Sequence, residues 1–193
     1  MLGPGRTSRI VLDHRARLGQ AGRVTVTVRP LQPGDRDAAT AADRASMQTF
    51  WDAGIPLPDD PDEELEGDLL LVGLLDGQVA GVACVDLHDG AWHLAQMSVH
   101  PSAQRRGVGS ALLLDVVARA AAAGASAVTL TTFRDVPWNM PFYARLGFVE
   151  IPPAELDDDL VATLRDEAAR GLVPERRVAM RLRLRRPDTA RAR

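Results

Sequence analysis

The chain has 193 residues, of which 46% are hydrophobic, and a formal net charge of −3. This length suits one domain with a sizeable core, and the charge gives no global reason to expect a nucleic acid or an anionic membrane as partner. The single cysteine, Cys84, excludes an intramolecular disulfide, and its apolar neighbours predict a buried, unreactive thiol. No apolar run is long enough to span a membrane, so we expect a cytoplasmic protein.

Both ends of the chain are expected to lie outside the folded part. Residues 1–22 carry arginines but few acids and predict a mobile basic tail. Residues 23–186 then form one domain, and residues 187–193 form a C-terminal tail.

The first half of the domain predicts strands and a helix. Val24–Arg29 alternates apolar and polar residues, which is typical of a strand, and Ala38–Phe50 is expected to be helical. Asp60–Glu63 has the acid, proline and carboxylate of a short helix start. A hairpin of Leu69–Leu75 and Val79–Val85 follows, with its tight turn at Asp76-Gly77-Gln78, and the next strand is Ala91–Val99.

The second half alternates helices and strands. The predicted elements are a helix from Ser110 to a C-cap at Gly124, a strand Ala127–Thr132 parallel to its predecessor, a short helix Asn139–Leu146, a helix Glu155–Arg170 and a last strand over 178–185. Asp115 and Arg119 are spaced for an ion pair on the first of these helices. Arginines alternate with apolar residues in the last strand and predict a basic outer face.

The segment Val99–Ser110 joins a strand to a helix through a basic, glycine-containing loop. Gly107 and Gly109 give the backbone freedom to turn several N–H groups toward one point, and the following helix adds its N-terminal donors. Together with Arg105 and Arg106, the segment predicts a phosphate or pyrophosphate site.

Two nucleotide-binding signatures do not fit this loop. A P-loop requires a lysine, and the chain contains none. A dinucleotide fingerprint would need a third small residue at Leu112 and a later acidic residue for the ribose.

A third pattern does fit, because Gln104-x-x-Gly107-x-Gly109 resembles the pyrophosphate-binding loop of the GNAT superfamily of N-acetyltransferases. Further along, Asn139-Met-Pro-Phe142-Tyr143-Ala-Arg-Leu146-Gly147-Phe148 is similar to the Phe-Tyr-x-x-x-Gly-Phe helix and turn of that family. The two motifs occur in the family's order, and the resemblance covers residues 24–185.

This resemblance implies an α/β (α+β) fold, a single domain in which a mixed sheet of about six to seven strands is flanked by helices. Two parallel strands would splay apart to hold acetyl-CoA, and no metal is implied. The diphosphate would lie on the loop, and the pantetheine arm would pair with the strand before it. The implied cofactor-binding residues are Met97, Val99, Gln104, Arg105, Arg106, Gly107, Val108, Gly109, Ser110, Asn139, Phe142 and Tyr143.

The resemblance also implies acetyl transfer by direct attack of an amine, either of a small molecule or of a protein or peptide. Tyr143 is then the general acid that protonates the leaving thiolate. Many relatives carry a glutamate on the strand before the loop, whereas this chain has Ala95 and Gln96, so we expect Gln96 to orient a water.

Several assignments stay open. The base could be His93 or an acid near Glu64, although a packed strand histidine is the favoured reading of His93, and His100 is also expected to be structural. Asn139 could contact the cofactor or only begin a helix. An acidic run could attract a cationic amine or simply be solvated; its members are Asp59, Asp60, Asp62, Glu63, Glu64, Glu66 and Asp68.

Two other functions are kept as alternatives. One is a non-catalytic sensor of acyl-CoA, which the missing glutamate would suit. The less favoured one is an RNA-binding module that uses the C-terminal arginines Arg176, Arg177, Arg181, Arg183, Arg185 and Arg186. The sequence fixes neither the acceptor amine nor the oligomeric state, so a homodimer stays open.

Overall fold

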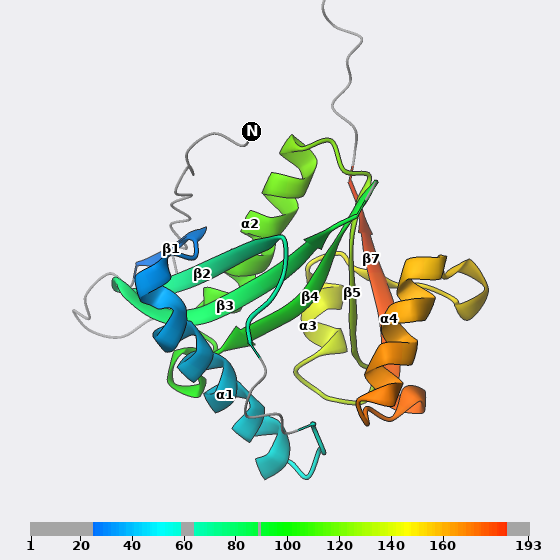
Figure 1. Cartoon of the computed structure of the whole chain (residues 1–193), viewed down its shortest axis with the longest axis horizontal. Helices are drawn as coiled ribbons and strands as arrows, with labels where there is room; N and C mark the ends of the chain where they lie inside the picture. Colours follow the sequence, from blue (N-terminus) through cyan, green and yellow to red (C-terminus); the bar gives the residue numbers. More distant parts are fainter. Residues whose placement is uncertain (1–24, 59–63, 89, 185–193) are drawn as a thin grey trace, which may run out of the picture.

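A computed structural model describes residues 25–58, 64–88 and 90–184. These residues form three layers, with one sheet between two pairs of helices (Figure 1). The strands are β1 (Val26–Pro30), β2 (Leu69–Leu75), β3 (Gln78–Leu87), β4 (Ala91–Val99), β5 (Ala127–Phe133), β6 (Val149–Glu150) and β7 (Arg177–Arg183). The α-helices are α1 (Arg36–Asp52), α2 (Val108–Ala122), α3 (Met140–Arg145) and α4 (Asp158–Ala169). The expected mixed α/β sheet is confirmed.

The sheet has seven strands in the order β1-β2-β3-β4-β5-β7-β6. Within it, β4 and β5 are parallel, and their pairing runs only from Ala91–Leu94 to Ala127–Leu130. Both strands continue beyond these residues without pairing to each other, so the expected splay is confirmed. Next to the splay, β3 pairs Val85 with Leu94 and Cys84 with Gln96, which leaves Ala95 as the extra residue of a bulge.

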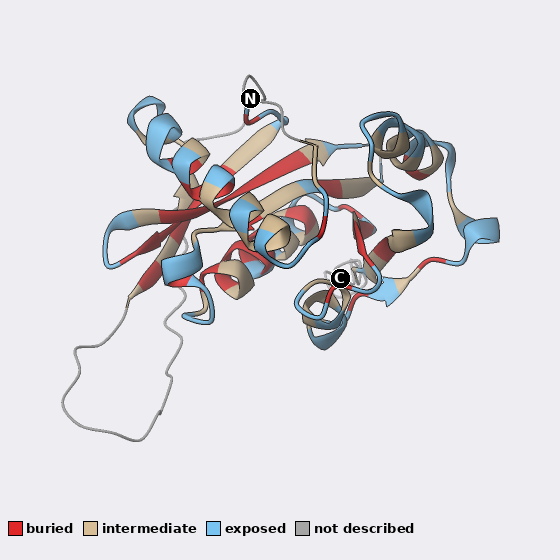
Figure 2. Cartoon of the chain, turned by 90° about the horizontal axis from the view of Figure 1, so that it is seen from below, coloured by how far each residue is buried: buried red, intermediate tan, exposed pale blue. Residues whose placement is uncertain are grey.

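Most of the core lies between the sheet and the pair α2 and α3. Its fully buried side chains include Leu71, Leu112, Leu130 and Met180. Helix α1 packs on the opposite face, where Ala39 contacts a second apolar cluster with residues of β2 and β3. Helix α4 covers β7 through Leu160 and Ala179. Buried positions follow the strands, whereas the outer helix faces are exposed (Figure 2).

Close packing places the N-terminus of α2 against the sheet. A Cβ atom at Gly81 of β3 would lie 2.7 Å from the Ser98 carbonyl oxygen and 3.2 Å from Cγ1 of Val108. The missing side chain at Gly81 therefore allows the first turn of α2 to approach β3 and β4 closely. This approach fixes where the basic loop meets the splayed strands.

Most local predictions from the sequence are confirmed, within a few residues at element ends. Asp76 and Gly77 both have positive φ, as the tight turn of a hairpin requires. The pair Asp115–Arg119 forms at 2.5 Å, and Cys84 is buried. The predicted helix start at Asp60–Glu63 lies outside the described residues.

Three expectations were wrong. Helix α2 begins at Val108 and not at Ser110. The helix expected over Glu155–Arg170 begins only at Asp158, because Pro153–Glu155 forms a separate 3₁₀ turn and the Asp157 carboxylate caps the helix. The outer face of β7 is not an open basic surface, because β7 lies between β5 and β6 and α4 covers it. Among the described helices, none has the length and apolar character needed to cross a membrane.

Candidate active site

A cavity of about 740 Å³ opens where β4 and β5 separate. Side chains from both sides of the sheet line it, including Asp43 of α1, Gln96 and Met97 of β4, and Asn139 and Tyr143 at α3. The splay therefore joins the face covered by α1 to the face covered by α3. Of the predicted site residues, the structure brings Gln96, Met97, Asn139 and Tyr143 together at this cavity.

Asp43 is the main feature of the cavity that sequence reasoning missed. Its side chain is only 8% exposed, and its Oδ1 atom accepts hydrogen bonds from Gln96 Nε2 at 2.7 Å and from Ser98 Oγ at 2.5 Å. Helix α1 directs it inward, because Asp43 is one turn after the buried Ala39. The sequence signal that could have identified Asp43 is an acidic residue on the apolar face of a predicted helix.

Gln96 points to α1, away from the core that contains Met97. Besides its bond to Asp43, it accepts a weak hydrogen bond from the Cys84 thiol at 3.7 Å. The amide of Gln96 therefore connects β3, β4 and α1 at the cavity wall. Orientation of a water by Gln96 stays a prediction.

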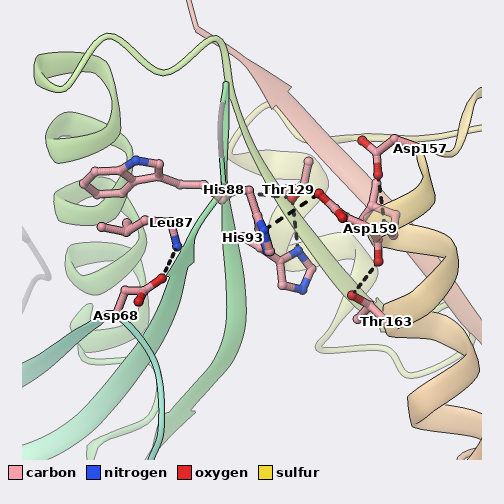
Figure 3. A network of polar contacts seen from close by, with 10 residues as sticks. Asp68, Leu87, His88, His93, Thr129, Asp157, Asp159 and Thr163 are labelled. Carbon is pink, nitrogen blue, oxygen red and sulfur yellow. Dashed lines mark hydrogen bonds and ion pairs between the residues drawn. The ribbon is translucent and has the colours of Figure 1, made fainter.

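His93, one candidate base, does not line the cavity. Its Nδ1 atom lies 3.0 Å from the Thr129 hydroxyl, in the paired part of β4 and β5 (Figure 3). Burial lowers the pKa of His93, although the nearby charge of Asp86 acts in the opposite direction. This geometry favours a packing role for His93 over a role as the general base. His100 is structural too, because its Nδ1 atom accepts a hydrogen bond from the Ser102 backbone N–H.

Tyr143 lines the cavity from α3. Its ring packs edge-on against Phe142 at 5.1 Å between centroids and against Phe148 at 6.0 Å. Desolvation raises the pKa of the Tyr143 phenol to about 12, and the positive charge of Arg177 opposes this shift. The phenol is therefore protonated throughout the neutral range. Asn139, one turn earlier, is at the N-cap position but makes no side-chain capping bond, and it also lines the cavity.

The predicted phosphate loop lies at the N-terminus of α2, and its residues 104–110 do not line the cavity. Gly107 has φ of 91°, as expected for a glycine that turns the chain into the helix. Gly109 does not have this role. It is helical, and its Cβ position would be 3.5 Å from Val99 and 3.6 Å from Phe142, so it provides a close but ordinary packing site.

The loop side chains have partners within the protein. Gln104 donates from Nε2 to the Val99 carbonyl oxygen at 3.4 Å. Arg106 lies 3.6 Å from Asp76 in the β2–β3 turn, and Arg105 itself has a positive φ of 58°. The loop thus remains attached to β4 and to the hairpin.

An ion pair and aromatic side chains form another part of the cavity wall. Arg177 of β7 binds Glu167 of α4 at 2.6 Å and the Thr131 hydroxyl at 3.0 Å, and its guanidinium lies 4.7 Å from the Phe133 ring centroid. Phe133 and Phe50 are neighbours, with centroids 5.9 Å apart. Three of the six arginines expected to form an RNA-binding face have carboxylate partners, in the pairs Arg176–Asp135, Arg177–Glu167 and Arg181–Glu155. Arg183 is exposed, and Arg185 and Arg186 lie outside the described residues.

The acidic run is only partly at the site. Glu64 and Glu66 line the cavity, whereas the Asp68 carboxylate accepts a hydrogen bond from the Leu87 backbone N–H at 2.8 Å. Asp59, Asp60, Asp62 and Glu63 lie outside the described residues. In the described parts of the chain, no group of histidine, cysteine and acidic side chains is arranged to hold a metal ion.

Comparisons with known proteins agree with this geometry. Residues 40–148 match the model of the acetyltransferase (GNAT) family. The ribosomal-protein-S18-alanine N-acetyltransferase of Escherichia coli is 18% identical, with a TM-score of 0.57 over 86% of this chain and 97% of that one. PaiA N-acetyltransferase of Thermoplasma acidophilum, solved with coenzyme A, is 16% identical, with a TM-score of 0.64 over 82% and 99%.

A third similar structure is N-acetylglutamate synthase of Neisseria gonorrhoeae in complex with coenzyme A and N-acetylglutamate. It is 21% identical, with a TM-score of 0.62 over 83% of this chain but only 35% of the synthase chain. At such low sequence identities, these structures show only that the fold is shared. Membership of the family rests on the match of residues 40–148 to the family model.

Proposed function

The chain belongs to the acetyltransferase (GNAT) family, and from this membership we propose that it transfers an acetyl group from acetyl-CoA to an amine. The acceptor is an amine of a small molecule or of a protein or peptide. The observation that carries the proposal is the cavity at the β4–β5 splay, which connects the α1 face of the sheet to Tyr143 on the other side.

The α2 loop suits the diphosphate of the donor. Gly107 turns the chain so that α2 starts at Val108, and the first intrahelical bond runs from the Ala111 N–H to the Gly107 carbonyl. The N–H groups that precede Ala111 in the first turn of α2 have no intrahelical acceptor and are available to an anion. Arg105 and Arg106 add positive charge. Gln104–Ser110 would hold the diphosphate, and Met97–Val99 would hold the pantetheine, near Asn139 and Phe142.

The reaction itself needs a nucleophilic nitrogen and a proton for the departing sulfur. The neutral amine attacks the thioester carbon, a C–N bond forms, the C–S bond breaks, and the nitrogen loses one proton. Tyr143 donates its hydroxyl proton toward the sulfur. Because its phenol stays protonated at neutral pH, this donor is ready in every turnover.

A panel of amines tests the proposal. Free coenzyme A would be measured with purified protein, acetyl-CoA, and spermidine, 2-phenylethylamine, L-glutamate or short peptides with free N-termini. Amine-dependent release supports acetyl transfer. Calorimetric binding of acetyl-CoA without release for any amine would instead support the acyl-CoA sensor. Cytoplasmic location and homodimer formation stay predictions from the sequence.

A further inference from the structure

We propose that Asp43 binds the amino group of the acceptor and takes up its proton during attack, and that the acceptor is a cationic amine with an apolar neighbouring group. This inference rests on the proposed acetyl transfer. It gives the site a base and a substrate class, neither of which follows from the family motifs in the sequence.

Asp43 places a buried carboxylate at the wall of the cavity. Asp43 is only 8% exposed, and it lines the cavity. A buried carboxylate requires hydrogen-bond donors, and Gln96 and Ser98 provide two. Because Asp43 also lines the cavity, an amine bound there can bring its N–H to this carboxylate.

Two residues of β4 hold the Asp43 side chain beside that strand. Gln96 and Ser98, which hold its carboxylate, alternate with Met97 and Val99, which pack toward the core on the other face. They follow the bulge at Ala95 and lie beyond the last paired residue, Leu94. Asp43 therefore adjoins the part of β4 that pairs with β3 but no longer with β5, where the thioester of the donor is proposed to lie.

Acidic side chains outnumber basic ones in the described lining of the cavity. Among the described residues that line it, the acidic ones are Asp43, Glu64, Glu66, Asp86 and Glu167, and the basic ones are Arg170 and Arg177. Glu167 and Arg177 already form an ion pair with each other. The remaining charges are mainly negative, which favours a cation and disfavours an acceptor with an additional carboxylate.

The cavity also has an apolar wall. Phe50, Leu57, Phe133 and Leu172 line the cavity, and all four belong to or pack against one separate apolar cluster. A volume of about 740 Å³ is in the range of small-molecule sites. An amine with an aromatic or aliphatic substituent would bury that substituent against these rings while its nitrogen reaches Asp43.

The proton balance gives Asp43 its chemical role. The ammonium ion loses one proton to solvent, and the neutral nitrogen attacks the thioester carbon. The nitrogen becomes much more acidic as the C–N bond forms, so its second proton can pass to the Asp43 carboxylate. The sulfur receives the Tyr143 proton, and the proton on Asp43 returns through solvent to the Tyr143 oxygen.

The decisive variant is Asp43→Asn, which keeps size and hydrogen bonding but removes the charge. We expect kcat/KM for 2-phenylethylamine to fall by about 10²-fold or more, because general-base catalysis contributes that much. Acetyl-CoA binding, measured by calorimetry, should stay within about twofold, because the diphosphate loop is not altered. Asp52→Asn is the matched control on the same helix, since Asp52 is exposed and does not line the cavity.

A second variant and a second probe series avoid dependence on the folding of Asp43→Asn. Ser98→Ala keeps the carboxylate but removes one of its hydrogen bonds, and we expect a loss of about 3–10-fold in kcat/KM. With the unmodified protein, 2-phenylethylamine should exceed L-phenylalanine in kcat/KM by about tenfold or more, because the added carboxylate of L-phenylalanine meets the acidic wall. L-Glutamate should be poorer still.

The outcomes separate this inference from the function on which it rests. If the unmodified protein releases no coenzyme A with any amine, the proposed acetyl transfer fails. If transfer occurs but L-glutamate or L-phenylalanine is preferred, the substrate class is wrong. If transfer occurs and folded Asp43→Asn retains its rate and pH profile, Asp43 is not the base. Thermal melting curves of each variant establish that it is folded.

Discussion

Asp43 on α1 and Gln96 on β4 are 53 positions apart in the chain and are joined by a hydrogen bond of 2.7 Å at the wall of the cavity. The bond fixes the carboxylate next to the end of β4 that does not pair with β5. Gln96 is thus a positioning residue for Asp43 in the mechanism that we propose.

Replacing Gln96 by a second acid tests this relationship. In Gln96→Glu, two carboxylates would be in hydrogen-bond contact, which raises the pKa of the pair. Because a protonated carboxylate is no base, activity should be lost at a higher pH than in the unmodified protein as the pH falls. The acid limb of the pH dependence of kcat/KM for 2-phenylethylamine measures this shift.

Gln48→Glu is a close control for that variant. Gln48 Nε2 also donates to an aspartate, Asp52, at 2.7 Å, but this pair is exposed and does not line the cavity. Its pH profile should match that of the unmodified protein. An unchanged profile for Gln96→Glu as well would contradict a role for the Asp43–Gln96 pair in proton transfer.

Tyr143→Phe should lower kcat while acetyl-CoA binding is retained. The variant keeps the ring that packs against Phe142 and Phe148 and loses only the hydroxyl. Loss of a general acid corresponds to about 10²-fold or more in kcat at saturating acetyl-CoA. Full turnover in this variant would remove Tyr143 from the mechanism.

The alkaline titration of Tyr143 can be followed directly. It is the single tyrosine of the chain, so phenolate absorbance reports on this residue alone. The native phenol should ionise near pH 12, and the unfolded phenol should ionise near its ordinary value of 10. The contribution of the protonated Tyr143 phenol to stability is therefore fully present below pH 10 and is lost as the pH rises from 10 toward 12. A native midpoint near 10 would show that the phenol is not desolvated.

His93→Asn separates a packing role from catalysis. Burial lowers the pKa of His93 below its ordinary value of 6.5, so the unfolded chain binds a proton that the native protein does not. The contribution of the neutral, buried His93 to stability is present above pH 6.5 and is lost as the pH falls below that value. Urea unfolding at several pH values should show a shallower acid decline for the variant. Its kcat/KM at neutral pH should change by no more than about threefold, because His93 does not line the cavity; a larger loss would make His93 part of the site.

Gly107→Ala tests the diphosphate loop. Alanine at φ of 91° is strained by about 1–2 kcal/mol, and relief of that strain would reorient the first N–H groups of α2. We expect the Kd for acetyl-CoA to rise by about tenfold or more, which is equivalent to about 1.4 kcal/mol. Gly124→Ala is the control, because Gly124 has φ of 83° and open space around it at the other end of α2. Equal donor binding in both variants would place the diphosphate elsewhere.

The features that the sequence determined are local in origin. The turn at Asp76-Gly77 and the pair Asp115–Arg119 depend on backbone preferences and on helical spacing of four residues, so neighbouring residues suffice to predict them. The loop around Gly107 and the motif around Tyr143 are also contiguous. They were sufficient to predict the family, the mixed sheet and the splay.

Only the tertiary structure decided the polar contacts on the side of the cavity that we propose for the acceptor. Asp43 had no visible partner in the sequence, and β7 showed alternating arginines that resembled a solvated face. Packing of α1 and α4 on the sheet brought Asp43 to Gln96 and Glu167 to Arg177. Buried polar groups must find partners wherever the chain brings them together, and such pairings between distant segments follow from packing and not from local pattern.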